Sequence, residues 1–351
     1  MGYKFTSSQR FTYGYIQFVE HFLGKKYGAV LTKNTRKRYY KKLHENLKSS
    51  GPGKIIQIDR RKDITLNEFR KEYVKKGLPV VMEGFAKDWG CCKNWSLDYF
   101  KENYGDDTIT ILDQNTQDLP YERIKFREVL NDISKGSKYL RFYPFLKSHP
   151  ERIADFDYKW LQSMRNKYTY ADAFQVFIGG KDKYTPMHHA SQGNLFIQAF
   201  GEKKWIIYSP YYTSIVDPEP ARNIYRNAPF KTEEGPFNPY EPNYETPYTL
   251  YKYIEGFETT LKPGDILYNP PFYWHTIKNP TDSIGISYKW IAPLYNFKMA
   301  PLYYFLEMFA TKPPIWKSYK LFKKEFNLLN IAEKGRLKKF EKELKKEASV
   351  N

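Results

Sequence analysis

Histidine is the residue type whose placement first suggests chemistry, because the chain has only six histidines and two of them lie in strongly patterned runs. His188 lies in the run TPMHHA, ahead of an alternating segment, and His275 ends the run PGDILYNPPFYWH. Their separation leaves room for several strands of a barrel. A facial iron site takes its histidines in this way, one near an early strand and one from a much later strand. The alternative is that both are polar residues with ordinary hydrogen-bond partners, which is the commoner fate of a single histidine.

Short strands between Pro and Gly turns would have to position these histidines. From Tyr139 onward the sequence predicts strands over 174–179, 194–198, 203–208, 259–261, 265–269 and 284–290. Such a series is typical of a barrel or a sandwich. Upstream, the pattern predicts strands within 54–59 and 77–85 and helices over 66–76, after Thr65, and 96–104, with Ser96 as the N-cap.

Composition shifts divide the chain into three parts. Residues 1–50 form a basic helical extension, in which Phe11, Tyr15, Phe18 and Phe22 recur at helical spacing. The run SSGPG at 49–53 ends it, and a domain over 54–295 follows, with a helical N-terminal part and a long Pro-rich insertion at 217–247. Insertions of that length are usually lids or face the substrate. Residues 296–351 form a second basic helical segment.

Several motifs in one order resemble those of the JmjC-type cupin oxygenases. The run TPMHHASQGNLFIQAFGEKKW resembles that family's T-P-x-H-x-D motif with its later N and G-x-K, and PGDILYNPPFYWH resembles its distal G-D-x-L-x-x-P-x-x-W-H. GLPVVMEGFAKD near the start and GISYKW near the end also match, so the resemblance covers about residues 55–295. It implies a mainly β protein with flanking helices and a double-stranded β-helix (cupin, jelly-roll) core. It also implies iron(II) and 2-oxoglutarate as cofactors.

The resemblance assigns roles residue by residue. His188 and His275 match the two histidine ligands of iron, and Lys203 matches the basic residue that pairs with the distal carboxylate of 2-oxoglutarate. Two further polar positions match cofactor-binding residues, Thr185 and Asn194. The plainer interpretation of Lys203 is a surface lysine in a turn, a role that suits the adjacent Lys204 better.

Ala190 is where the chain departs from the family, which has Asp or Glu as a third iron ligand at this position. His189 is adjacent, but successive strand residues point to opposite faces. Gln192 and Glu202 could replace the carboxylate only if the backbone bulges. The vacant position would therefore hold a halide such as chloride, as in the halogenases of this chemistry, or water, or the site is inactive.

Two main functions remain open. The first is an iron(II)- and 2-oxoglutarate-dependent oxygenase, hydroxylase-like or halogenase-like, which activates a C–H bond of a small-molecule or protein substrate that the sequence does not identify. The alternative is a catalytically inactive cupin-like binding module. A third class, a basic scaffold acting on RNA or chromatin, follows from net charge alone.

Net charge limits the kinds of partner to expect, and the number of cysteines indicates the cellular compartment. The formal net charge is +18, from 57 Lys and Arg against 39 Asp and Glu, and it favours acidic partners, including nucleic acid and anionic membranes. Much of it lies in 25–48 and 317–346, where such runs are more often solvated helix faces. Cys91 and Cys92 are the only cysteines and are adjacent, so a reducing intracellular compartment, cytoplasmic or nuclear, is expected. No apolar run is long enough to span a membrane, and the sequence does not indicate the oligomeric state.

Overall fold

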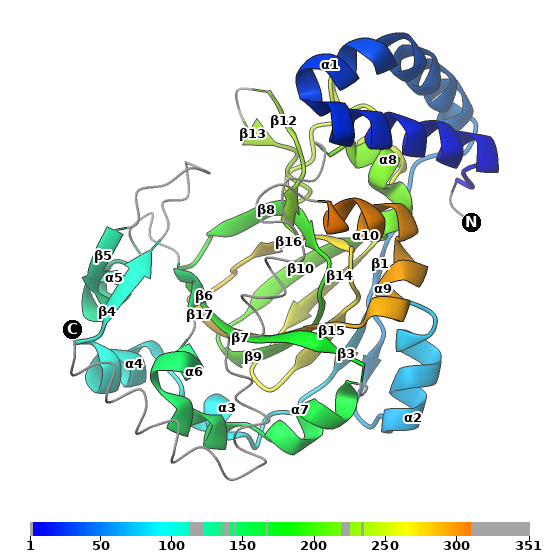
Figure 1. Ribbon diagram of the computed structural model, residues 1–351. Helices are drawn as coiled ribbons and strands as arrows, with labels where there is room; N and C mark the ends of the chain where they lie inside the picture. The colour runs from blue at the N-terminus through cyan, green and yellow to red at the C-terminus, as the bar shows by residue number, and fades with distance from the viewer. Residues whose placement is uncertain are drawn as a thin grey trace.

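The structure is a computed structural model of the chain. It describes residues 3–111, 122–133, 135, 140–143, 145–165, 168–218, 225–232 and 235–309. Figure 1 shows a β-barrel flanked by helices, with the long helix α1 (Ser7–Lys48) folded back on itself at one side.

Two large sheets form the barrel. The first has the order β1-β14-β10-β16-β8-β11, and the second has the order β2-β3-β15-β9-β17-β7-β6. The strands of the first sheet are β1 (Ile55–Gln57), β8 (Tyr184–Ala190), β10 (Lys203–Tyr208), β11 (Tyr225–Asn227), β14 (Gly256–Leu261) and β16 (Trp274–Lys278). Those of the second are β2 (Arg60–Arg61), β3 (Val80–Met82), β6 (Leu140–Tyr143), β7 (Tyr170–Gly179), β9 (Gly193–Phe200), β15 (Ile266–Asn269) and β17 (Ser283–Ile291). Spatial neighbours come from distant parts of the chain, as a double-stranded β-helix requires.

Smaller elements surround the barrel. Two short hairpins pair β4 (Thr108–Ile111) with β5 (Glu122–Lys125) and β12 (Phe230–Thr232) with β13 (Gly235–Pro236). The α-helices after α1 are α2 (Leu66–Glu68), α3 (Gly90–Asn94), α4 (Leu97–Tyr104), α5 (Phe126–Asp132), α6 (Phe145–Ser148), α7 (Tyr158–Met164), α8 (Thr213–Val216), α9 (Pro293–Met299) and α10 (Pro301–Met308). The remaining turns are the π-helix η1 (Phe69–Val74) and the 3₁₀ turns η2 (Pro150–Asp155), η3 (Pro210–Tyr212) and η4 (Tyr251–Tyr253).

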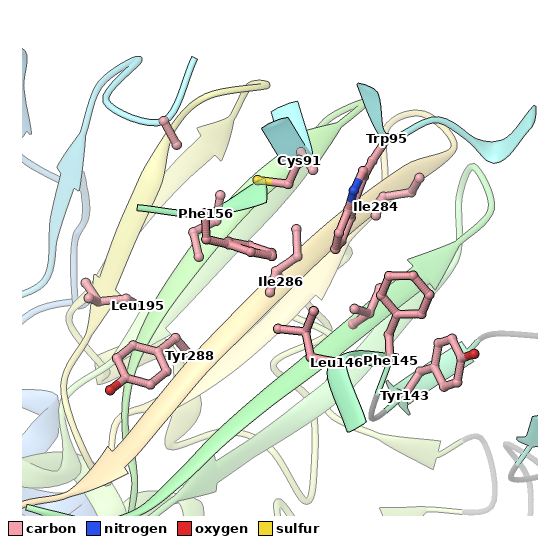
Figure 2. Close-up of a cluster of buried hydrophobic side chains, with 14 of the residues drawn as sticks. Cys91, Trp95, Tyr143, Phe145, Leu146, Phe156, Leu195, Ile284, Ile286 and Tyr288 are labelled. Atoms are coloured by element: carbon pink, nitrogen blue, oxygen red, sulfur yellow. The ribbon is translucent and has the colours of Figure 1, made fainter. Parts of the chain in front are cut away.

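Strand β17 shows how the sequence builds both faces of the second sheet. Its even-numbered residues from Ile284 to Trp290 are large and apolar, and they belong to the core that the helices cover. In Figure 2, Ile284, Ile286 and Tyr288 lie in one cluster with Trp95 of the α3–α4 segment and Phe145 of α6. Its odd-numbered residues from Ser283 to Lys289 are the inward ones, and three of these four, Ser283, Gly285 and Ser287, are small. Because period-two alternation separates the faces, this strand leaves space inside the barrel.

Three apolar clusters hold the elements together. One lies between the two sheets and includes Phe196 of β9, Trp205 of β10 and Leu267 of β15. A second packs helices and hairpins on the outer face of the second sheet. The third joins the outer face of the first sheet to α1, α8 and α10. The site described below therefore lies between sheets that are both supported from outside.

Most predicted strands are present, often with wider bounds. The strand predicted over 203–208 coincides with β10, and the others correspond to β1, β3, β7, β9, β14, β15 and β17. The helix predicted over 66–76 is α2 followed by the π-helix η1, with Thr65 as its N-cap. Ser96 caps α4 as expected.

Four points differ from the predictions or can be compared with them only in part. The run TPMHHA does not merely precede a strand, since it lies in β8, and β16 was not foreseen. Residues 145–164, expected to belong to a region of strands, form α6, η2 and α7, whose apolar residues cover the second sheet. The basic segment predicted at 296–351 is described only to residue 309, through α9 and α10, so the rest of that prediction lies outside the described residues.

Two smaller observations complete the fold. Cys91 and Cys92 are free thiols, with their Sγ atoms 3.9 Å apart. Within the described ranges, the helices are all too short or too polar to cross a lipid bilayer.

Candidate functional site

Strand register brings the two predicted histidines together inside the barrel. In the β8–β16 pair, His188 lies opposite His275, and their ring centroids are 4.3 Å apart. The pairing then shifts, because Ile277 lies opposite Thr185 rather than Pro186. This β-bulge reverses the alternation of β8, so Thr185 and His188 share the inward face although they are three residues apart.

Both imidazoles are oriented by a backbone carbonyl. The Nδ1 of His188 lies 2.9 Å from Pro186 O, and the Nδ1 of His275 lies 2.8 Å from Tyr273 O. An imidazole nitrogen beside a carbonyl must be the protonated one, so Nε2 carries the lone pair in both rings. Metal-binding histidines are commonly held in this way. Burial is the main cause, and the nearby Lys289 a lesser one, that together lower the pKa of His275 to about 4 against the opposing effect of the hydrogen bond to Tyr273 O. His275 is therefore neutral at physiological pH, as a metal ligand must be.

Lys203 lies deeper in the same barrel and is completely buried. Its Nζ donates to Asn279 Oδ1 at 2.8 Å and to Ser283 Oγ at 2.9 Å. Gly285 makes room for its side chain, because a Cβ there would lie 3.2 Å from Lys203 Cε and 2.3 Å from Phe196 Cζ. Burial of an ammonium group is costly unless it has polar partners, and Asn279 and Ser283 are two such partners.

Lys204 occupies the opposite environment. Its side chain is 40% exposed and pairs with Glu258 at 3.1 Å on the outer face of the first sheet. The two adjacent lysines are thus separated by strand alternation, one facing the barrel interior and one facing solvent.

Asn194 and its neighbours form the polar wall beside the histidines. Asn194 Oδ1 accepts a hydrogen bond of 2.6 Å from Ser287 Oγ, and the Asn194 side chain is buried. On the adjacent strand, Asn269 Nδ2 lies 3.3 Å from His275 Nδ1. Trp205 stacks on the His275 ring at 5.5 Å, so this imidazole is held between an aromatic face and polar groups.

Two of the three candidates to replace the carboxylate at position 190, His189 and Glu202, lie away from the two histidines. Ala190 is buried, and its carbonyl accepts from Phe272 N at 2.8 Å. His189 points to the outer side, where its ring packs edge-on against Trp274 at 4.4 Å. Glu202 lies in the turn between β9 and β10, where its backbone N–H binds Thr281, at the opposite end of the barrel strands. Gln192 is buried in the turn that follows Ala190. In the described part of the chain, no three His, Cys, Asp or Glu side chains are arranged to bind one metal ion.

Lys289 is a pocket residue that the sequence analysis missed. It is inward-facing on β17, opposite Asn194 of β9, and is only 8% exposed. Its Nζ donates to Gln175 Oε1 at 3.0 Å and lies 5.6 Å from the centre of the Phe177 ring. Burial lowers its pKa to about 7. A lysine at an odd position among Ser283, Gly285 and Ser287 was the available signal, because period-two alternation places it on their inward face.

These residues fit a metal centre in part. Two imidazoles from paired strands, each with its lone pair on Nε2, provide two ligand positions of the kind a facial site uses. The usual anionic ligand is missing, and Lys289 places positive charge near His275. The chemistry of this donor set therefore suits a divalent metal only together with ligands from outside the chain, of which at least one is anionic.

Part of the long insertion lies beside this site. Strand β11 extends the first sheet by pairing with β8, with Tyr225 opposite Ala190 and Asn227 opposite His188. Residues 219–224 and 233–234 of the same insertion lie outside the described residues. The backbone of the insertion thus forms one border of the strand that carries His188.

The two-sheet barrel with an inward pair of histidines is the arrangement of a JmjC-type cupin, and comparison with known proteins agrees. A family model described as a cupin-like domain matches residues 66–301. The chain belongs to this family, which confirms the double-stranded β-helix expected from its motifs.

Curated relatives carry JmjC names. They include JmjC domain-containing protein D of Dictyostelium discoideum, 27% identical over 247 residues, which cover 63% of this chain and 53% of that protein. Arginine-specific demethylase JMJ20 of Arabidopsis thaliana is 22% identical over 281 residues, 68% of this chain and 58% of that protein. The 2-oxoglutarate and iron-dependent oxygenase JMJD4 of Gallus gallus is 22% identical over 274 residues, 68% of this chain and 61% of that protein. The chain thus spans between half and two thirds of the length of these relatives.

Proposed function

We propose that this chain is an iron(II)- and 2-oxoglutarate-dependent oxygenase of the JmjC type with an open metal centre held by His188 and His275. The observation that carries the proposal is the pair of imidazoles on neighbouring strands, whose ring centroids are 4.3 Å apart. Each has its Nδ1 beside a backbone carbonyl, which places the lone pair on Nε2. A relative named as a 2-oxoglutarate and iron-dependent oxygenase supports the choice of cofactors.

Lys203 is the proposed partner of the distal carboxylate of 2-oxoglutarate. A buried ammonium group, already held by Asn279 and Ser283, supplies a fixed positive charge at the inner end of the pocket. Thr185 shares the inward face and would add a hydroxyl, and Asn194 would contribute a polar wall. Bound iron would supply the activation of O2 that couples decarboxylation of 2-oxoglutarate to attack on a C–H bond.

An exogenous anion is the proposed third ligand at the position that Ala190 leaves open. Iron(II) with two neutral imidazoles and dianionic 2-oxoglutarate carries no net charge, and Lys289 in its protonated form adds one positive charge nearby. A chloride ion would offset that charge and fill the coordination position. This arrangement favours a halide-dependent reaction over hydroxylation.

A second candidate function is a binding module for a dicarboxylate without metal. Lys289 favours it specifically, because its protonated form, which dominates below a pKa of about 7, would give the barrel interior a second buried ammonium group besides that of Lys203. In this case the second lysine would provide the positive charge that the metal provides in an oxygenase.

The substrate of the proposed reaction is a small molecule or a protein. Relatives named as arginine-specific and lysine-specific demethylases make a protein side chain one candidate class. The insertion strand β11, beside His188, is the segment proposed to face the substrate.

Anaerobic titration separates the two candidate functions. Purified protein should bind iron(II) only when 2-oxoglutarate is present, more tightly with chloride, and should release succinate once O2 is admitted. His188→Ala and His275→Ala should each abolish iron binding, while Lys204→Ala serves as a matched control with no effect. Binding of 2-oxoglutarate that is indifferent to iron would support the binding module, and absence of iron binding with or without chloride would refute the oxygenase.

A further inference from the structure

The N-terminal helix α1 is a hairpin whose two arms lie side by side. Gly24 has a φ of 73° and interrupts the helix, so residues 7–23 and 25–48 form separate arms. The arms approach most closely at Gly28, where a Cβ would lie 2.6 Å from Glu20 Cα. Across this contact, Thr32 Oγ1 donates to Glu20 Oε1 at 2.7 Å, and Arg36 pairs with Glu20 at 2.7 Å.

The base of the hairpin is anchored to the barrel domain. Arg36 pairs with Asp217 at 2.5 Å, and Tyr40 donates to Ser214 O at 2.8 Å. Leu43 and Leu47 are fully buried in the cluster that α1 shares with the first sheet. These contacts fix the direction of the hairpin, and Figure 1 shows it standing at the edge of the molecule next to α8 and α10.

The bend of the hairpin is apolar and exposed. Around Gly24 the exposed fractions are 45% for Phe22, 48% for Leu23, 65% for Tyr27, 72% for Val30 and 63% for Leu31. We call these five residues the apolar tip.

Exposed aromatic rings continue the apolar tip along the first arm and onto α10. Phe11, Tyr15 and Phe18 are exposed on the first arm, and the rings of Phe18 and Phe22 contact those of Phe305 and Phe309. Single exposed apolar residues are normal, but a continuous patch of this kind indicates an interaction surface.

The second arm is strongly basic. Its exposed cationic residues are Lys26, which lies within the bend, and, along the rest of the arm, Lys33, Lys37, Arg38, Lys41, Lys42 and Lys48. The acidic residues of α1 are Glu20, which is buried against Arg36, and Glu45. The hairpin therefore presents an apolar end and a positively charged shaft.

Charge and shape together identify the partner. An anionic phospholipid surface offers negative headgroups to the shaft and an apolar layer to the tip, whereas a nucleic acid or an acidic protein surface accounts only for the lysines. The C-terminal sequence 317–346 is itself rich in lysine, so it does not complement the charge of the shaft. A second copy of the hairpin would likewise bring basic shafts together.

We propose that the apolar tip of the α1 hairpin inserts into the headgroup region of an anionic membrane and anchors the protein peripherally at its surface. The barrel then stays in water, joined to the membrane through the base contacts of Arg36 and Tyr40. This anchor is independent of the chemistry inside the barrel.

Vesicle flotation of the full chain tests the proposal. The protein should float with vesicles that contain phosphatidylserine and phosphatidylcholine, but not with phosphatidylcholine alone, and high salt should release it. The triple variant Leu23→Ser, Val30→Ser, Leu31→Ser should lower the partition coefficient about 100-fold or more. Replacing Lys33, Lys37 and Lys41 with Gln should lower it about five-fold per lysine.

Matched controls come from exposed residues elsewhere. Ile56→Ser, and Gln at Lys62, Lys71 and Lys101, should leave partitioning unchanged, and thermal unfolding should show that every variant folds. Partitioning by folded triple variants equal to that of the wild type would overturn the proposal. The proposal would also be overturned if the triple variant with a polar tip lost self-association while its vesicle binding stayed unchanged.

Discussion

Lys203 provides the sharpest test of the pocket, because its neighbour Lys204 is a built-in control. Lys203→Met keeps most of the side-chain volume and removes only the ammonium group, which is completely buried and bound to Asn279 and Ser283. Loss of one partner of a buried charge pair costs about 2–5 kcal/mol of binding free energy. That range corresponds to a Kd for 2-oxoglutarate raised about 30-fold to 4,000-fold.

Lys204→Met should change the same Kd less than about two-fold, since an exposed ion pair such as the one with Glu258 contributes little. The assay is isothermal titration of 2-oxoglutarate under anaerobic conditions with iron(II) and, separately, with a chelator. Without ligand, Lys203→Met should unfold at a temperature equal to or above that of the wild type, because the variant no longer buries a charge. Equal effects of the two substitutions on the Kd would refute the assignment of Lys203 to the pocket.

Three further substitutions test the centre and its walls. Ala190→Asp should tighten iron(II) binding and abolish any dependence on chloride, measured by metal titration with and without the halide; a site that still requires chloride would contradict the vacant-ligand interpretation. Lys289→Met should weaken chloride-assisted iron binding but leave chelator-treated protein folded, as monitored by circular dichroism; enhanced chloride dependence would contradict the charge argument. Gly285→Ala should lower the free energy of unfolding by about 1–3 kcal/mol in a denaturant titration, because its Cβ would lie 2.3 Å from a Phe196 atom. The control Gly193→Ala should lower it less, because its Cβ would have no neighbour closer than 3.8 Å.

The sequence predicted the barrel strands well where alternation was regular. Strand β10 and the capping residues Thr65 and Ser96 could be located from local patterns alone. The helices between residues 145 and 164 could not, because each is short and its apolar face is defined by the second sheet rather than by its own periodicity.

The site itself was predictable only through its motifs. Strict alternation would place Thr185 and His188 on opposite faces of β8. The bulge that brings them to the same face arises from the pairing of β8 with β16, and no local sequence pattern reveals that pairing. Alternation places Lys289 on the same face of β17 as Ser283, Gly285 and Ser287, but only the pairing of β17 with β9 shows that this face points into the barrel. The spacing of Phe11, Tyr15, Phe18 and Phe22 correctly predicted a helix, but periodicity cannot tell a face buried in a core from one left exposed.

The backbone around Ala190 has a consequence for the evolution of this site by substitution at position 190. The carbonyl of Ala190 is bonded to Phe272, and its strand is paired with β11 on one side and with β16 on the other, so the main chain is held independently of the side chain at that position. A single base substitution turns any alanine codon into a codon for aspartate or glutamate. With His188 and His275 as the proposed ligands, the chain therefore stands one such step from a set of three iron ligands.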